Sequence, residues 1–352
     1  MLLVTDTTPR PRKQEQEPAS EEVTEVAPGV LRLMLPLQGF TGLGHVNCYA
    51  LEDERGFAVV DPGMMGRTHW KQLEKRLAAA GIPMSRVHTA VVTHSHPDHF
   101  GGAGYLHREV GADIVTHRWF RTWWDPTEPP DVDPEDLPPS EGPVGRQPWG
   151  GKGHHIPWKR RMGFKVAKRF PKLMAAPRPS VRLADAEPIR LARREWISVH
   201  TPGHTADHLC LYDPTTGTML TGDHVLPTIT PHISGLTSAD PLLEFFDSLD
   251  KVAAFTDTTT ALPAHGHPFA DLQGRVDDIK RHHEQRLDLL RRASADLGRP
   301  ATVMEMSTYL FSARAQGQMA DSETFAHLEH LRHAGQAERL EHDGLYEYVV
   351  HD

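Results

Sequence analysis

The chain has 352 residues, of which 38% are apolar and 24% charged, and its formal net charge is −9 at pH 7. This composition is typical of a folded globular protein, and the negative charge excludes a general electrostatic attraction to nucleic acid. No apolar run reaches the roughly 18 residues of a transmembrane helix, and the N-terminus lacks the apolar core of a signal peptide, so we expect a cytoplasmic protein.

The first part of the chain predicts a tail followed by strands. Residues 1–24 are rich in Pro, Gln, Glu and Thr without an apolar period, and we expect them to form a disordered tail. Strands are predicted at 26–37, 46–51 and 57–60, and a helix at 68–80. The two cysteines, Cys48 and Cys210, lie in strand-like runs without a metal-binding spacing, and we interpret both as buried thiols.

The most informative stretch follows a β-branched strand at 87–92 and precedes a predicted helix at 103–110. It contains His94, His96, Asp98 and His99 within six positions. Side chains on a strand-to-helix loop can converge on an ion, and imidazole and carboxylate groups suit zinc, iron or manganese. We therefore predict a metal site on this loop.

Residues 121–182 separate the predicted strand at 112–116 from the second half of the chain. The stretch 123–143 holds seven prolines and seven acids, and 151–182 holds ten Lys or Arg and no acid. Apolar residues at steps of three and four predict a basic amphipathic helix near 157–174. We interpret 121–182 as an insertion and a candidate lid, which contacts an anionic, partly apolar substrate or a membrane surface, or which only packs on the fold.

Further residues of the metal-ligand type follow strand-like runs in the second half. His204 lies in Pro-Gly-His-Thr, Asp223 in Thr-Gly-Asp-His and His265 in Ala-His-Gly-His, each beside a glycine. The predicted strands of this half are 197–201, 209–212, 219–220 and 259–263, and a helix is predicted at 241–254.

The C-terminal part predicts three helices and a hairpin, which together resemble a winged helix. The helices begin at 275, 302 and 322, and the hairpin spans 339–350 with Asp343-Gly344 at its turn. Residues 285–352 contain seven Lys or Arg and eleven Asp or Glu, whereas a helix that reads a DNA groove should be basic. We therefore predict that residues 283–352 serve packing or homodimer formation and bind no specific DNA.

Taken in order, the motifs HxHxDH, GHT, GD and HG resemble those of the metallo-β-lactamase superfamily over residues 25–283, and the wider pattern is most similar to its subgroup with a C-terminal winged helix. The resemblance implies an α/β fold, namely an αββα sandwich at 25–282 with a helical insertion, followed by a winged-helix-like domain at 283–352. It implies one metal on His94, His96 and His204, a second on Asp98, His99 and His265, a bridge by Asp223, and support from behind by Asp61.

The implied cofactor is a pair of Zn2+ ions, with iron or manganese as alternatives. Two adjacent metals lower the pKa of a bridging water, so that hydroxide exists at neutral pH, and Asp98 would orient it. We rank first the hydrolysis of an ester, thioester or lactone, with a small substrate that is anionic and has an apolar acyl part. The alternatives are a phosphodiesterase or endoribonuclease, whose substrate backbone the ten basic residues would track, and an iron-dependent persulfide dioxygenase.

Overall fold

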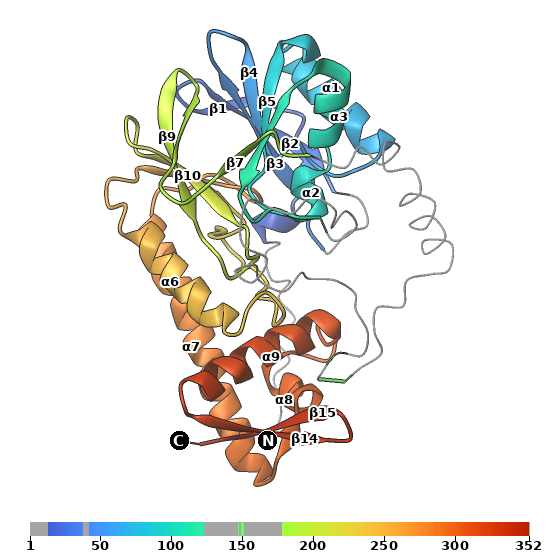
Figure 1. Cartoon of the computed structure of the whole chain (residues 1–352), viewed down its shortest axis with the longest axis vertical. Helices are drawn as coiled ribbons and strands as arrows, with labels where there is room; N and C mark the ends of the chain where they lie inside the picture. Colours follow the sequence, from blue (N-terminus) through green and yellow to red (C-terminus); the bar gives the residue numbers. More distant parts are fainter. Residues whose placement is uncertain (1–12, 38–41, 123–146, 148, 151–177, 352) are drawn as a thin grey trace, which may run out of the picture.

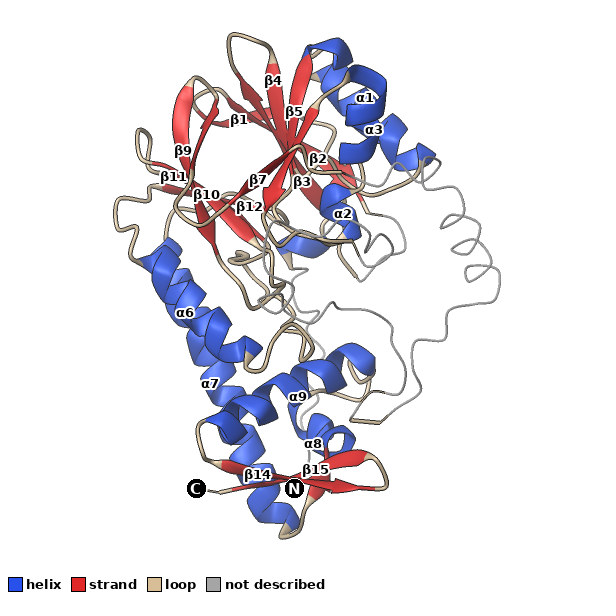
Figure 2. Cartoon of the chain, in the orientation of Figure 1, coloured by secondary structure: helices blue, strands red, loops and turns tan. Residues whose placement is uncertain are grey.

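The computed structural model of the chain describes residues 13–37, 42–122, 147, 149–150 and 178–351. Two sheets pack face to face with helices on their outer faces, and a smaller helical part with its own sheet lies at one end (Figures 1 and 2). The predicted basic helix near 157–174 and most of the predicted insertion lie outside the described residues.

The first sheet has seven strands within the described residues, in the order β1-β2-β3-β4-β5-β6-β7. Their bounds are β1 Thr24–Ala27, β2 Val30–Pro36, β3 His45–Glu52, β4 Phe57–Val60, β5 Val87–Val91, β6 Asp113–His117 and β7 Val181–Leu183. Strands β1 to β4 pair antiparallel, whereas β4, β5, β6 and β7 pair parallel. The carboxyl ends of β4 and β5 therefore meet at one edge, and the loops that follow these two strands lie side by side there.

The second sheet has five strands in the described part of the chain, in the order β12-β11-β10-β9-β8. Their bounds are β8 Pro188–Leu191, β9 Arg194–His200, β10 Leu209–Asp213, β11 Thr218–Gly222 and β12 Thr260–Pro263. The strands β11 and β12 pair parallel and the other neighbours antiparallel. The loops that carry His204, Asp223 and His265 follow β9, β11 and β12 respectively.

Alternating side chains of the strands divide between an inner core and two outer cores, as expected for half-buried strands. Tyr49 of β3 and Leu211 of β10 pack between the sheets with the fully buried Trp196. Their chain neighbours Cys48 and Cys210 point outward beneath helices and are buried free thiols, which confirms that prediction. The covering helices are α1 Arg67–Ala79 and α3 Ala103–Val110 on the first sheet, and α6 Pro241–Ala253 and α7 Leu272–Leu297 on the second.

The part of the chain from residue 283 to 351, called the C-terminal module below, forms most of a further apolar core, which also includes Trp149 and Leu242 of α6. Its elements after α7 are β13 Ala301–Thr302, α8 Val303–Leu310, α9 Gln318–His333, β14 Ala337–His342 and β15 Leu345–Val350, with the sheet order β13-β15-β14. Helix α7 runs without a break from the sandwich into the module, so the boundary predicted at residue 283 lies inside a helix. Helix α9 lies between the module's sheet and the sandwich (Figure 1), which explains why most of its residues are buried.

The N-terminal segment differs from the disordered tail that we expected over residues 1–24. Residues 1–12 are outside the described part, but Gln14–Gln16 form a short 3-10 helix, η1, and β1 begins at Thr24. The Glu15 side chain is buried, and its carboxylate accepts hydrogen bonds from the backbone N–H groups of Thr228 (2.8 Å) and Ile229 (3.1 Å). Composition could not reveal this order, because the partners of Glu15 are backbone groups more than 200 positions away.

Among the described residues, no helix combines the length and the apolar character that crossing a lipid bilayer requires.

Candidate metal centre

His94, His96, Asp98 and His99 lie in the loop between β5 and α3, called the histidine loop below. This loop includes the short helix α2, Pro97–Phe100. The loop lies against the turn that follows β4, because the residues that contact this turn, Gly101 and Gly102, have no side chain. A Cβ atom on Gly101 would lie 2.0 Å from the backbone nitrogen of Met65, and one on Gly102 would lie 2.3 Å from the carbonyl oxygen of Pro62. The Gly-Gly pair thus permits a close backbone approach that places the histidine loop beside Asp61.

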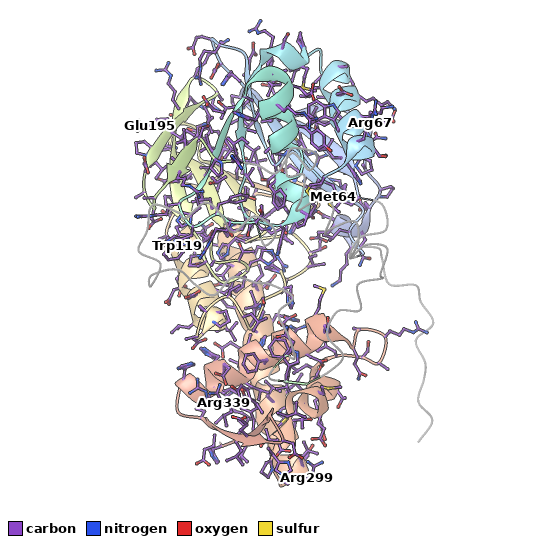
Figure 3. All side chains as sticks on the ribbon, turned by 45° about the vertical axis from the view of Figure 1, so that its right-hand side comes forward. Met64, Arg67, Trp119, Glu195, Arg299 and Arg339 are labelled. Atoms are coloured by element: carbon purple, nitrogen blue, oxygen red, sulfur yellow. The ribbon has the colours of Figure 1, made fainter. Side chains whose placement is uncertain are left out.

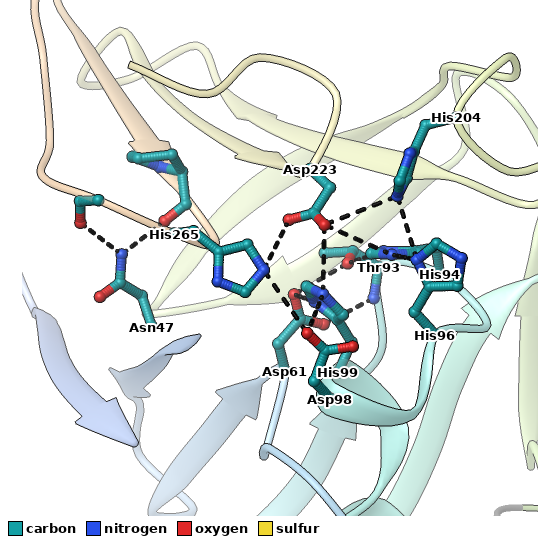
Figure 4. Close-up of polar contacts among 12 residues, drawn as sticks. Asn47, Asp61, Thr93, His94, His96, Asp98, His99, His204, Asp223 and His265 are labelled. Atoms are coloured by element: carbon teal, nitrogen blue, oxygen red, sulfur yellow. Dashed lines mark hydrogen bonds and ion pairs between the residues drawn. The ribbon is translucent and has the colours of Figure 1, made fainter. Parts of the chain in front are cut away.

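The first group of metal-ligand side chains comes from both sheets (Figure 4). His96 Nδ1 lies 2.9 Å from His94 Nε2 and 3.1 Å from His204 Nε2. Asp223 Oδ2 lies 3.9 Å from His94 Nε2 and 3.6 Å from His204 Nε2. These four residues form one group of side chains that could hold a metal ion.

The second group consists of Asp98, His99 and His265. Asp98 Oδ2 lies 3.7 Å from the Nε2 atoms of both His99 and His265. Asp223 also reaches this group, since its Oδ1 lies 3.2 Å from His265 Nε2 and its Oδ2 lies 3.5 Å from His99 Nε2. All seven residues predicted as ligands therefore converge, and Asp223 lies between the two groups.

The donor atoms fit a pair of divalent cations. His99 Nε2 and His265 Nε2 are buried and have no hydrogen-bond partner among the described residues, although both face carboxylate oxygens. An unpaired buried polar atom costs about 1–3 kcal/mol, which coordination to a cation removes. Five imidazoles and two carboxylates form a donor set suited to zinc, iron or manganese.

The opposite ring nitrogens of the histidines make hydrogen bonds that aim the rings. His204 Nδ1 donates to the backbone carbonyl of His232 at 2.7 Å, and His265 Nδ1 donates to that of His45 at 2.6 Å. His99 Nδ1 lies 2.9 Å from Asp61 Oδ2. A proton on Nδ1 leaves the lone pair on Nε2, which is the form that a metal binds.

Asp61 connects β4 to the histidine loop from behind. It has a left-handed backbone conformation, with φ 53°, and its side chain is buried. Its Oδ1 accepts from the backbone N–H of Thr93 at 2.9 Å, and its Oδ2 accepts from the Thr93 hydroxyl at 2.8 Å. These contacts place Asp61 where a residue supporting His99 and the start of the loop should lie.

Burial and neighbouring charges set the protonation of the site. Burial lowers the pKa of His94, His96 and His204, which keeps these imidazoles neutral. Burial also disfavours the charged form of Asp223, but His265 and His99 beside it hold its pKa well below the ordinary value. Burial also disfavours the charged forms of His99 and His265, but Asp223 beside them raises the pKa of both, so these two imidazoles would release a proton when a cation binds.

Sequence reasoning did not identify three residues that support the ligands. His45 and His232 contribute backbone carbonyls, which carry no sequence signature. The ring of the buried His208 accepts the backbone N–H of Asp223 at 3.0 Å on Nε2. Its position four residues after His204 was the only sequence signal for this role.

A two-sheet sandwich with two adjacent groups of His and Asp side chains, on the loops that follow its strands, is the framework of a metallo-hydrolase. A model of the Metallo-beta-lactamase superfamily matches residues 41–296, and the chain belongs to this family. The family model ends within α7, so membership of a winged-helix subgroup remains a prediction.

Relatives support the family over most of the chain. The chain is 22% identical over 318 residues to "Probable metallo-hydrolase YqjP" of Bacillus subtilis, covering 82% of this chain and 88% of that protein. It is 25% identical over 314 residues to an atrochrysone carboxyl ACP thioesterase of Aspergillus fumigatus, covering 86% and 80%.

Solved structures share the fold over nearly the whole chain. A metallo-beta-lactamase family protein from Thermus thermophilus is 28% identical with a TM-score of 0.70, covering 93% of this chain and all of that one. A beta-lactamase domain protein from Burkholderia ambifaria is 26% identical with a TM-score of 0.71, covering 95% and 96%. The predicted α/β sandwich is thereby confirmed.

Proposed function

We propose that the chain is a dinuclear zinc hydrolase of an ester, thioester or lactone. The observation that carries this proposal is the position of Asp223, whose carboxylate faces both ligand groups at once. A single-metal site would not need a carboxylate between two sets of converging imidazoles. Zinc suits the set because it accepts imidazole and carboxylate ligands and leaves a coordination position for water or substrate.

The seven ligand residues would be shared between two ions. His94, His96 and His204 would hold one ion, Asp98, His99 and His265 the other, and Asp223 both. The two ions, when bound, supply hydroxide at neutral pH and polarise the substrate carbonyl. Asp98 has a second role, because a carboxylate that ligates through one oxygen can accept a hydrogen bond from the attacking water through the other. Asp61 would keep His99 in the tautomer that ligates.

Two findings support a carboxyl substrate over a phosphodiester. The Aspergillus fumigatus relative is named for thioester hydrolysis, and the alignment covers most of both chains. The net charge of −9 also disfavours a polyanionic substrate, although the ten basic residues of 151–182 favour it locally. We therefore propose an acyl thioester as the first substrate class to test, and we expect the substrate to carry an anionic group.

The test is a hydrolysis panel with zinc-loaded protein. It compares acyl-CoA, lactones, p-nitrophenyl esters, bis(p-nitrophenyl) phosphate and single-stranded RNA. We expect turnover of a carboxyl substrate that is abolished in His94→Ala and retained in His342→Ala, a control in which the changed side chain is 75% exposed. Turnover of only the phosphate substrates would favour the phosphodiesterase alternative. Iron in the purified protein together with oxygen-dependent consumption of a persulfide would favour the dioxygenase.

We also propose that the C-terminal module is winged-helix-like and serves packing. The order helix, strand, helix, helix, strand, strand supports the first part. The module's acids support the second, because Arg299 and Arg339, labelled in Figure 3, pair with Glu305 (2.6 Å) and Glu329 (3.0 Å) of the same module. We expect the full chain not to retard duplex DNA sequence-specifically; a sequence-specific gel shift would refute this. Sedimentation would test the predicted homodimer, and liposome flotation the predicted membrane contact.

A further inference from the structure

The loop between β11 and α6, residues 223–240, begins at Asp223 and lies between the sandwich and the C-terminal module (Figure 1). The carbonyl of His232 on this loop accepts the Nδ1 hydrogen of His204 at 2.7 Å. The other nitrogen of that ring, Nε2, lies 3.1 Å from His96 Nδ1 in the first ligand group. The backbone position of His232 therefore sets the orientation of a ligand that the proposed function requires.

The ring of His232 points to the C-terminal module. Its Nδ1 lies 3.4 Å from Oε2 of Glu323 on α9. The Glu323 side chain is buried, and its other oxygen pairs with the Arg286 guanidinium of α7. The Arg286 guanidinium also lies 4.6 Å from the centre of the Phe311 ring. A buried carboxylate that is held by a guanidinium is a rigid acceptor, since withdrawing either partner leaves an unpaired buried charge.

A second contact holds the same loop to α9. The backbone N–H of Gly235 donates to Ser322 Oγ at 3.1 Å. A Cβ atom on Gly235 would lie 2.5 Å from the Phe325 ring and 2.9 Å from the Ser322 carbonyl oxygen. The loop and the helix are thus in close backbone contact three residues from His232.

A second buried acid of α9, Glu329, has its partners within the C-terminal module. Glu329 is equally buried, but its carboxylate accepts from Arg332 (2.8 Å), Arg339 (3.0 Å) and the Tyr348 hydroxyl (2.5 Å), all of them within the module. Glu329 therefore stabilises the module, whereas Glu323 faces outward across the contact with the sandwich. The two glutamates form a matched pair on one helix.

We propose that Glu323 is a positioning residue for the metal centre: the C-terminal module, through Glu323 and His232, fixes the ring of His204 and so sets the affinity of the first ligand group for its metal. The inference rests on the proposed function in taking His204 as a ligand. It assigns the module a part in the metal site in addition to packing.

The experiment measures zinc affinity by competition with a chromophoric chelator, on the full chain, without any substrate. Partners of metal-ligating histidines contribute about 10–100-fold to metal affinity. Because Glu323 acts one contact further away, we expect Glu323→Gln to weaken one zinc about tenfold and to leave the other within about threefold. Glu329→Gln should lower the melting temperature of the metal-free protein and leave both zinc affinities unchanged.

A second variant keeps the test decisive if Glu323→Gln does not fold. His232→Phe retains the backbone carbonyl that His204 needs and removes only the ring nitrogen that faces Glu323, so it should weaken the same zinc. Unchanged zinc affinity in the folded variants, or equal losses in the Glu323 and Glu329 variants, would overturn the inference. If the wild-type chain bound no zinc, the proposed function itself would fail, and this outcome is distinct from the first.

Discussion

The replacement Asp61→Asn tests how the metal centre is supported from behind. Asparagine has the same shape as aspartate and tolerates the left-handed conformation of this position, so the backbone should be retained. The Asp61 carboxylate accepts three hydrogen bonds, one on Oδ1 and two on Oδ2. An amide has one oxygen, and its nitrogen must therefore face at least one of these donors.

The two orientations of the amide have different consequences. With its nitrogen toward Thr93, it opposes the Thr93 backbone N–H and loosens the start of the histidine loop. With its nitrogen toward His99, it forces the His99 proton onto Nε2, where the metal should bind. A hydrogen bond to a charged group contributes about 1.5–3 kcal/mol, which corresponds to about 10- to 150-fold in metal affinity.

We expect the affinity for zinc of the proposed site on Asp98, His99 and His265 to fall by this factor in Asp61→Asn. Competition titration with a chromophoric chelator measures it, and the melting temperature of the metal-free protein reports any general loss of stability. Asp53→Asn is the matched control, because Asp53 is also buried and also accepts backbone N–H groups, but its partners are Arg55, Gly56 and His88. Zinc affinities within about threefold of wild type in Asp61→Asn would refute the reasoning.

Three further predictions concern single aspartates. Asp223→Ala should reduce the metal content from two ions per chain to one or fewer, measured by elemental analysis, because this carboxylate faces both groups; an unchanged content of two would contradict the bridging role. Asp98→Asn should lower kcat by more than it raises KM, and a kcat within about threefold of wild type (~0.7 kcal/mol on the barrier) would exclude the orienting role. Asp207→Asn should stabilise the protein at pH 8 and not at pH 4. Burial raises the pKa of Asp207 to about 6, so ionisation of Asp207 destabilises the folded state as the pH rises through that value. In Asp207→Asn, denaturant unfolding should therefore show a free energy of unfolding that is higher than wild type by at most about 3 kcal/mol at pH 8. This difference should disappear at pH 4.

The fold and the convergence of the seven ligand-type side chains could be predicted because the motifs that indicate them are local in sequence. Four ligands fall within six positions after one strand, and the other three each follow a strand beside a glycine. Parallel pairing of β4 with β5 and of β11 with β12 then brings the loops of each sheet to a common edge. The position of each ligand-type residue at a strand end favoured a shared site, and the resemblance of the motifs to those of the metallo-β-lactamase superfamily implied which residues converge.

Apart from Asp61, the support of the ligands could not be predicted, because it uses backbone atoms and distant partners. His45 and His232 act through carbonyls, and Glu15 binds backbone N–H groups of the β11–α6 loop from a segment that composition marks as disordered. The acids of α9 suggested only that this helix does not read DNA. The burial of Glu323 against Arg286 depends on α7 running on past residue 283.

Three segments outside the two sheets have a common physical role at the β11–α6 loop. This loop has no strand of its own, so its backbone groups need partners from elsewhere. Glu15 accepts the N–H groups of Thr228 and Ile229, and the Arg275 guanidinium of α7 donates to the carbonyls of Leu226 (2.6 Å) and Ile229 (2.7 Å). Helix α9 holds the following turn at Gly235. The N-terminal segment, α7 and the C-terminal module therefore all restrain one loop, and that loop carries Asp223 and the carbonyl that aims His204. Since a displacement of about 1 Å can disrupt the geometry of a site, the precision of this site depends on these flanking segments in addition to the sheets.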